Sequence, residues 1–481
     1  MIKKANDYLK KADFPQTYKN KFHFDVPTGW MNDPNGCIKA FGKYHIFYQH
    51  YPYEAKLGLM HWGHVATEDF INWENLPVAL APDHDYDKDG CWSGSAFMHN
   101  DLLWLMYTGC CDGKQQQCLA YSSDGITFEK YEGNPVIRTE QLPPNSIYYS
   151  FRDPYVVQRN GMFYVLLGGR DIKHNKGRVM LYKSEDLINW TFVNDIITGD
   201  DMVDPGIYEC PSIATVSGKD ILISSLNFTP NKGELFRNFA NPIYHIGNLD
   251  YETGEFQCSN KNLLDYGFDF YAPQFISSDE EQKILISWLQ MWEQTYPTEK
   301  YGWVGSLGLP RKVSLVGEAI STYPALDFDK LFKKTETYVL GLGGIVSQIK
   351  LQDRLYVFKN YFNENFETIV IILKFDDGCY LEIKIDQESK KIILSRKNTK
   401  FIPNSKTTLV DNLIERIYPY EKINSLEIWL DQSIVEIYVN DGEAVLSSNF
   451  YCDGENVTVE YQSTGQTLVD LDIYKFKKGG E

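Results

Sequence analysis

The sequence predicts an all-β protein of two domains, a five-bladed β-propeller followed by a β-sandwich. Three observations predict this fold. Apolar and aromatic runs of about four to eight residues recur along the chain, an aspartate-to-aromatic pattern repeats, and strict apolar/polar alternation appears late in the sequence. Aromatic residues also make up 15% of the chain, and such enrichment favours strands.

The N-terminus starts with basic residues, but no apolar run of roughly 7 to 15 residues follows it, so we expect no signal peptide. A short helix is expected to begin within residues 8–11. No segment approaches the roughly 18 apolar residues of a transmembrane helix. Nine cysteines, scattered from Cys37 to Cys452, fit reduced thiols better than a disulfide framework. These features predict a cytoplasmic protein.

Strands are expected at the apolar runs 44–48, 102–107, 162–167 and 284–288, which are bounded by Gly, Asn, Asp and Pro clusters. An imperfect repeat accompanies them, in which Asp is followed after two or three residues by an aromatic residue. It occurs at 69–73, 124–128 and 186–190, and its aromatic residues lie 55 and 62 positions apart. A period of that size in a β-rich chain, with about four strands per period, is typical of a propeller.

The pattern breaks near residue 325, where a charged stretch begins. We therefore expect the propeller, with its short leader, over 1–325, a linker over 326–336 and the sandwich over 337–481. The later runs 380–385 and 426–430 alternate between apolar and polar residues. This alternation predicts strands with one buried face and one solvent-exposed face, and a sandwich packs such strands most simply.

Candidate chemistry begins at Trp30 to Gly36. Asp33, Pro34, Asn35 and Gly36 predict a tight turn, because proline fixes φ and Asn-Gly tolerates left-handed conformations. Taken alone, this stretch is an ordinary loop between two strands.

Two other places combine acidic side chains with strand-like surroundings. Arg152 and Asp153 precede the apolar residues 155–157, where either a surface ion pair or a functional carboxylate held ionised by its neighbour fits the pattern. Glu209 is a lone acidic residue within the weakly polar run 207–216. A carboxyl group in apolar surroundings tends to keep its proton, which suits a proton donor.

Together these three motifs resemble the signature motifs of glycoside hydrolase family 32, which contains invertases, fructanases and sucrose-6-phosphate hydrolases. The resemblance covers nearly the whole chain, and that family's fold is a five-bladed propeller followed by a β-sandwich. Further matching segments are 47–49, 61–64, 92–95, 269–274, 309–311 and 431–442.

The resemblance implies that Asp33 is the nucleophile, Glu209 the acid/base and Asp153 the stabiliser of the transition state. Cleavage of a β-fructofuranoside passes through an oxocarbenium-like state, so one carboxylate attacks while a protonated partner supplies the leaving oxygen with hydrogen. Retaining enzymes hold these two carboxyls roughly 5 to 5.5 Å apart. Substrate-binding residues implied by the resemblance are Asn32, Gln49, Leu57, Trp62, Trp92, Ser93, Arg152, Asp269, Tyr271 and Trp288.

Two positions depart from the family pattern. Leu57 stands near a position where many relatives carry tryptophan, which alters the expected preference for the leaving group. Gln432 replaces the usual arginine in the sandwich motif and affects packing or an interface more than catalysis. Cys210 is expected to tune the neighbouring carboxyl rather than to react.

The formal charge of −18 argues against nucleic acid or an anionic membrane as a partner and favours a neutral sugar. No cofactor is expected. We expect no metal site either at His50, His61 and His64 or at Cys110, Cys111 and Cys118, because the thiols lack paired spacing and the histidines lie in an aromatic context.

The predicted function is retaining hydrolysis of sucrose, sucrose-6-phosphate or short fructo-oligosaccharides such as inulobiose. Two alternatives stay open: fructosyl transfer through the same intermediate, and a sugar-binding propeller without activity. Three carboxylates together argue against the second alternative. The sequence also allows a homo-oligomer that forms through the β-sandwich.

Overall fold

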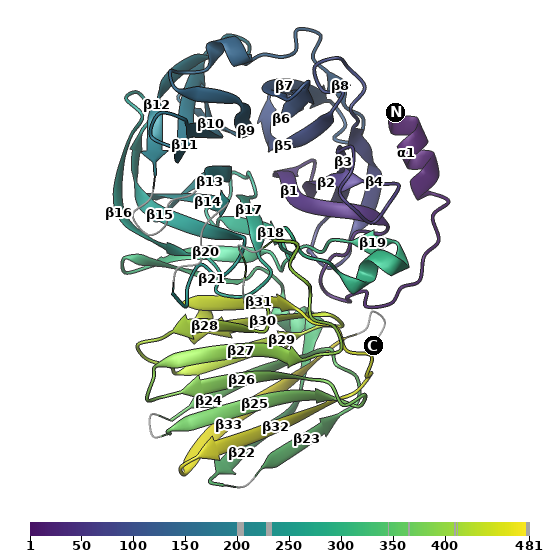
Figure 1. Ribbon diagram of the computed structural model, residues 1–481, viewed down its shortest axis with the longest axis vertical. Helices are drawn as coiled ribbons and strands as arrows, with labels where there is room; N and C mark the ends of the chain where they lie inside the picture. Colours follow the sequence, from purple (N-terminus) through teal and green to yellow (C-terminus); the bar gives the residue numbers. More distant parts are fainter. Residues whose placement is uncertain are drawn as a thin grey trace.

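The computed structural model describes residues 1–199, 206–227, 233–344, 346–363, 366–407, 410 and 412–477. The last four residues of the predicted sandwich, 478–481, lie outside these ranges. The predicted all-β fold class is confirmed: five small sheets form the upper unit of Figure 1, and two six-stranded sheets form the lower one.

Each small sheet is one blade of the propeller, and its four main strands are antiparallel neighbours in chain order; the first sheet has one added strand, described below. Blade 1 contains β1 (Gly29–Ala40), β2 (Lys43–Tyr51), β3 (His61–Thr67) and β4 (Glu74–Leu80). Blade 2 contains β5 (Gly90–His99), β6 (Leu102–Cys111), β7 (Lys114–Ser122) and β8 (Glu129–Lys130). Blade 3 contains β9 (Ser146–Arg159), β10 (Met162–Asp171), β11 (Lys176–Ser184) and β12 (Thr191–Thr198). Blade 4 contains β13 (Ile207–Val216), β14 (Lys219–Asn227), β15 (Ala240–Asp250) and β16 (Glu255–Leu263). Blade 5 contains β17 (Tyr271–Phe275), β18 (Ile284–Trp288), β20 (Arg311–Val316) and β21 (Ala319–Pro324).

The first strand of each blade is the innermost one. Strands β1, β5, β9, β13 and β17 contact one another in ring order, and β17 returns to contact β1 (Figure 1). A short strand late in the chain, β19 (Trp303–Val304), pairs in parallel with the start of β1. This pairing ties the last blade to the first, so the innermost strands of different blades face a common axis.

The aspartate repeat marks the same turn in successive blades. Asp69, Asp124 and Asp186 each accept backbone N–H groups from the residues two and three positions later, at 2.8 to 3.0 Å. Each turn joins the third strand of a blade to the fourth. Asp250 makes the corresponding turn in blade 4, where no aromatic residue follows at the expected spacing. The repeat therefore reports Asp-capped turns.

The sandwich consists of two antiparallel sheets. Sheet one holds, in spatial order, β22 (Phe332–Leu342), β33 (Thr467–Phe476), β24 (Tyr356–Phe362), β29 (Ser425–Leu430), β30 (Ile434–Val439) and β31 (Ala444–Asn449). Sheet two holds β23 (Ser347–Leu351), β32 (Val457–Thr464), β25 (Thr368–Phe375), β26 (Tyr380–Asp386), β27 (Lys391–Asn398) and β28 (Glu415–Pro419).

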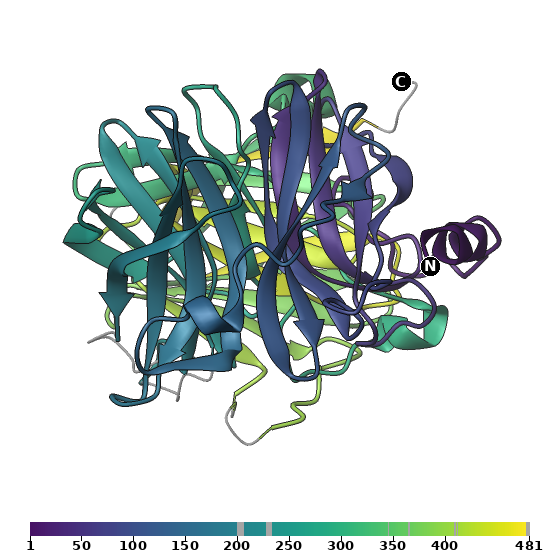
Figure 2. The same ribbon diagram turned by 90° about the horizontal axis from the view of Figure 1, so that it is seen from above.

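Whether buried and exposed residues alternate along a sandwich strand depends on what covers the outer face of its sheet. In β26 every second residue is buried, as predicted, and those residues join the core between the sheets. In β29 all six residues are buried, so the expected solvent-exposed face is wrong there. The reason is that residues of the propeller segment and of β22 cover its outer side, where Glu427 accepts a hydrogen bond from the Tyr323 hydroxyl at 2.7 Å. Figure 2, seen from above, shows the sandwich directly behind the propeller.

Buried charges join the two domains. The guanidinium of Arg311 donates to Asp265 and to Glu436, each at 3.0 Å, and all three side chains are buried. His23 lies between Asp431 and Glu436 at 3.0 and 3.3 Å. Burial lowers the pKa of His23, but these two carboxylates outweigh burial and raise the pKa to about 9. The network holds the last blade and the N-terminal segment against the sandwich.

Short helices occupy the ends and the junction. The helix α1 runs over Ile2–Leu9, so it ends where the sequence predicted a helix to begin. Between β21 and β22 the chain forms α2 (Phe328–Leu331), within the predicted linker. The exact domain boundaries stay a prediction. Within the described parts of the chain, 3-10 turns lie at Thr139–Gln141, Pro297–Tyr301 and Asn440–Gly442. Over the residues that the structure describes, we find no helix with the length and apolar character of a membrane span.

Candidate active site

A β-bulge interrupts the innermost strand of every blade. The pairing register with the second strand shifts at residues 32–33, 93, 153–154, 210–211 and 272–273. A proline directly follows the bulged residue in four blades, where its missing N–H leaves no ladder bond unmade. The predicted tight turn at Asp33 is therefore wrong: this residue lies inside β1, which is bulged rather than reversed. Bulges re-aim side chains, and here they turn polar groups toward the propeller axis.

The structure brings the three predicted catalytic carboxylates together. Asp33 and Asp153 come from the bulges of blades 1 and 3, Glu209 directly precedes the bulge of blade 4, and the thiol of Cys210 links the two aspartates. Its Sγ lies 3.5 Å from Asp33 Oδ2 and 3.7 Å from Asp153 Oδ2. All three carboxylates are at most 9% exposed. Ring closure of the propeller is what makes residues so distant in sequence neighbours.

The Asp33 carboxylate has one bound and one unbound oxygen. Oδ2 accepts a hydrogen bond from the Ser93 hydroxyl at 2.7 Å. Oδ1 is buried, and none of the described residues donates a hydrogen bond to it. Burial raises the pKa of Asp33, while hydrogen bonds from Ser93 and Asn32 lower it and the charge of Glu209 raises it. The hydrogen bond from Ser93 therefore fixes the orientation of this carboxylate.

Asp153 stands in a strained backbone position with φ of 62° and accepts the backbone N–H of Cys210 at 2.9 Å. Burial raises the pKa of Asp153 to about 7; Arg152 lowers it, and the charges of Glu209 and Asp33 raise it further. Its carboxyl group therefore titrates near neutrality. Burial also raises the pKa of the Cys210 thiol well above its usual range, so the thiol stays protonated and can donate to both aspartates.

Glu209 has polar surroundings, contrary to the apolar setting expected from its sequence neighbours. Its Oε1 accepts a hydrogen bond from the Arg152 guanidinium. Its Oε2 accepts one from Asn227 at 2.8 Å and another from the Tyr271 hydroxyl. The sequence neighbours of Glu209 did not predict this setting, because β9 and β17 of the neighbouring blades and β14 of the same blade supply the partners.

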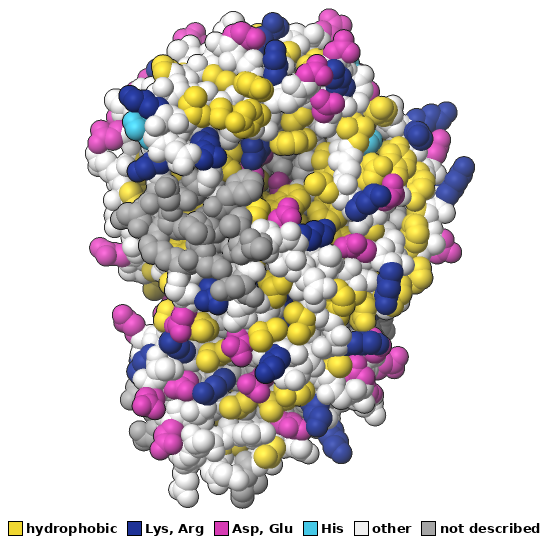
Figure 3. Space-filling view, in the orientation of Figure 1, with side chains coloured by type: hydrophobic (Ala, Val, Ile, Leu, Met, Phe, Trp, Pro, Cys, Tyr) yellow, Lys and Arg dark blue, Asp and Glu magenta, His cyan; other side chains and the backbone are white. Residues whose placement is uncertain are grey.

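The carboxylates line a cavity of about 340 Å³ that opens at the centre of the propeller. Figure 3 shows the hollow in the upper unit, with hydrophobic side chains gathered beside it. A larger cavity of about 460 Å³ lies at the other end of the innermost strands, and Asp279 is the one carboxylate among its lining residues. Clustered carboxylates make the smaller cavity the candidate active site.

The predicted binding residues divide into two groups. Six line the cavity: Asn32, Gln49, Leu57, Trp92, Ser93 and Arg152. Four do not line it: Trp62, Asp269, Tyr271 and Trp288. In this second group Tyr271 still touches Glu209, whereas Trp62 packs in the blade core and donates to the Trp92 carbonyl at 3.1 Å.

Asp269 faces the sandwich instead of the cavity. It accepts hydrogen bonds from Arg396 at 2.8 Å and from the Asn449 backbone at 2.9 Å. Trp288 packs edge-on against Trp30 and Trp292, with ring centres 5.9 and 5.1 Å apart. Both side chains support the cavity from behind.

Sequence reasoning missed several residues that line the cavity: Gly58, Met60, Asp89, Asn227, Phe239, Trp292 and Glu293. Most lie in strand ends and loops outside the recognised motifs. An aromatic residue four positions after Trp288 was the signal available for Trp292, which stacks on Trp30 with ring centres 6.1 Å apart.

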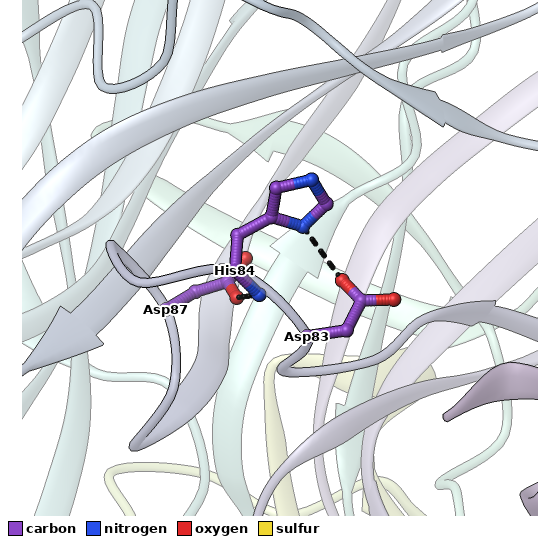
Figure 4. A group of neighbouring side chains, drawn as sticks. All are labelled: Asp83, His84 and Asp87. Carbon is purple, nitrogen blue, oxygen red and sulfur yellow. Dashed lines mark hydrogen bonds and ion pairs between the residues drawn. The ribbon is translucent and has the colours of Figure 1, made fainter.

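Asp83, His84 and Asp87 form the one cluster of potential metal ligands found among the described residues (Figure 4). The ammonium group of Lys130 lies 2.6 Å from both Asp83 and Asp87 and donates to the Ala81 carbonyl. A lysine therefore already supplies the positive charge that balances these carboxylates, and the arrangement gives no support to a metal ion.

Comparison with known proteins gives a consistent result. The family model described as "Glycosyl hydrolases family 32 N-terminal domain" matches residues 23–324, and the corresponding C-terminal model matches residues 355–475. A sucrose-6-phosphate hydrolase of Escherichia coli is 34% identical over 90% of each chain. A raffinose invertase, also of Escherichia coli, is 33% identical over 89% of each chain. The solved GH32 beta-fructofuranosidase BmSUC1 of Bombyx mori superposes with a TM-score of 0.85 at 33% identity, covering 99% of this chain and 98% of that one.

Proposed function

Because the chain belongs to glycosyl hydrolase family 32, we propose that it is a retaining β-fructofuranosidase acting on sucrose, sucrose-6-phosphate or short fructo-oligosaccharides. The observation that carries the proposal is the meeting of three buried carboxylates, Asp33, Asp153 and Glu209, in one cavity. The relatives that are named for hydrolysis of sucrose-type substrates support the same reaction class.

In this proposal Asp33 is the nucleophile. Its carboxylate attacks the anomeric carbon of the fructosyl unit, while Ser93 holds Oδ2 and fixes the orientation of the carboxylate. Glu209 gives its proton to the glycosidic oxygen as the bond breaks, and a covalent fructosyl-enzyme forms. Glu209 then takes a proton from water, which attacks the same carbon and restores Asp33.

Asp153 and Arg152 assist without forming bonds to carbon. The Asp153 carboxylate accepts hydrogen bonds from fructose hydroxyls, and these strengthen as positive charge develops on the ring. Arg152 contacts Glu209 and lies 3.9 Å from Asp153, so it partly neutralises the two carboxylates. Tyr271 orients Glu209 from behind.

No disulfide bond forms among the described residues, which include all nine cysteines. This supports a reducing compartment and, within the proposal, a cytoplasmic enzyme that meets small imported sugars.

Replacement of the reacting carboxylates tests the function. We expect Asp33→Asn and Glu209→Gln each to lower kcat for fructose release from sucrose by several orders of magnitude, with an unchanged circular dichroism spectrum. Asp279→Asn, which removes a carboxylate from an exposed loop outside the site, is the matched control. Near-normal turnover in either active-site variant contradicts the assignment.

Methanolysis tests whether the enzyme retains the configuration at the anomeric carbon, because a retaining enzyme forms the methyl β-fructofuranoside. Product analysis at high sucrose concentration separates hydrolysis from fructosyl transfer.

A further inference from the structure

Two exposed carboxylates, Asp89 and Glu293, lie at the mouth of the active-site cavity. Asp33, at the other extreme, is 7% exposed and lies in the depth of the cavity. A substrate that places its fructosyl anomeric carbon at Asp33 must leave its other half near the mouth. The leaving group therefore faces Asp89 and Glu293, together with Leu57, which is 58% exposed.

The positively charged side chains in and beside this cavity already have acidic partners. Arg152 is the one Lys or Arg side chain among the described residues that line it, and this arginine bonds to Glu209. Lys88, the neighbour of Asp89 in sequence, forms an ion pair with Asp112 at 2.7 Å. Among the described residues that line the cavity, five carboxylates thus stand beside a single guanidinium, and these side chains make the potential at its mouth negative.

The remaining wall is apolar and aromatic. Met60, Trp92, Phe239 and Trp292 line the cavity beside the carboxylates. Aromatic and aliphatic side chains of this kind cover the C–H faces of a neutral sugar, while carboxylates accept hydrogen bonds from its hydroxyl groups. Apart from the indole N–H groups of the two tryptophans, these side chains offer no donor to a phosphate, and none of them carries a positive charge.

We infer that this cavity selects a neutral leaving sugar and discriminates against a leaving glucosyl unit that carries a 6-phosphate. The inference rests on the proposed function and narrows its substrate to sucrose-type sugars without phosphate. Asp89 and Glu293 are the residues that set this preference, because like charges at the mouth repel a dianionic substrate as it binds.

The first experiment compares kcat/KM for sucrose and for sucrose-6-phosphate on the purified protein at low ionic strength. Repulsion of a doubly charged phosphate by two carboxylates in water amounts to about tenfold in favour of sucrose. Raising the salt concentration to about 0.5 M should narrow the ratio, because salt screens exposed charges. Equal or faster hydrolysis of the phosphorylated sugar overturns the inference while leaving the proposed function intact.

The second experiment changes the charge at the mouth. The double variant Asp89→Asn, Glu293→Gln should lower the ratio of the two kcat/KM values severalfold toward one. Glu185→Gln, which removes a carboxylate from an exposed turn outside the cavity, should leave the ratio at its wild-type value. A ratio that stays the same in the double variant contradicts the assignment of Asp89 and Glu293. A protein that releases fructose from neither substrate contradicts the proposed function, and this inference with it.

Discussion

Replacement of Asp153 by asparagine should stabilise the protein while it removes activity. A buried carboxylate with a pKa of about 7, against 3.8 in the unfolded chain, binds more protons when folded. Its contribution to the free energy of unfolding therefore falls as the pH rises from about 4 to about 7. At roughly 1.4 kcal/mol per pKa unit, the cost of ionising it above pH 7 has an upper bound of about 4 kcal/mol.

Asparagine keeps much of the local geometry, because its Oδ1 can still accept the Cys210 backbone N–H. It loses the attraction to Arg152, which reduces the gain below the upper bound. We expect urea denaturation at pH 8.5 to show a higher midpoint for Asp153→Asn than for the wild type, and nearly equal midpoints at pH 4. The control Asp279→Asn should shift neither midpoint. A variant that is inactive and folded but no more stable at pH 8.5 would refute the reasoning.

Two further predictions concern single contacts. Tyr271→Phe should lower kcat by about ten- to a hundredfold with little change in KM, because it removes a hydroxyl that orients Glu209; an unchanged kcat contradicts that role. His23→Gln should lower stability at pH 6, because the histidine charge between Asp431 and Glu436 is fully present below pH 6.5. That difference should vanish as the pH rises through about 9, and urea midpoints at pH 6 and pH 10 measure it.

Local patterns in the sequence were enough to predict strands and blades. Period-2 alternation and short apolar runs depend on which face of a strand is buried, and each run named in advance lies within a strand. The aspartate repeat predicted the propeller. The repeat arises because each aspartate caps a turn, and the aromatic residue that follows is not what makes the turn. Asp250 forms the same turn without the aromatic residue, so the aspartate-to-aromatic pattern does not include it.

The side chains of the active site could be predicted only where they belong to a sequence motif. Asp33 and Asp153 directly precede prolines at bulges, and Glu209 precedes the Cys210-Pro211 bulge, which gives a local signal; the structure brings all three carboxylates together. Asn227, Phe239 and Trp292 carry no such signal, because their convergence depends on how the blades are arranged around the axis. The expected apolar setting of Glu209 failed for the same reason.

The motif that contains Asp269 illustrates how the sandwich contributes to catalysis without entering the cavity. Arg396, from β27 of the sandwich, binds Asp269 with both side chains fully buried. Two residues later, β17 begins at Tyr271, whose hydroxyl bonds to Glu209. A buried charge left without its partner is strongly destabilising, so this ion pair fixes the start of β17 relative to the sandwich. Arg396 thus anchors Asp269 from the second domain, and this contact places Tyr271, and through it Glu209, at the propeller axis.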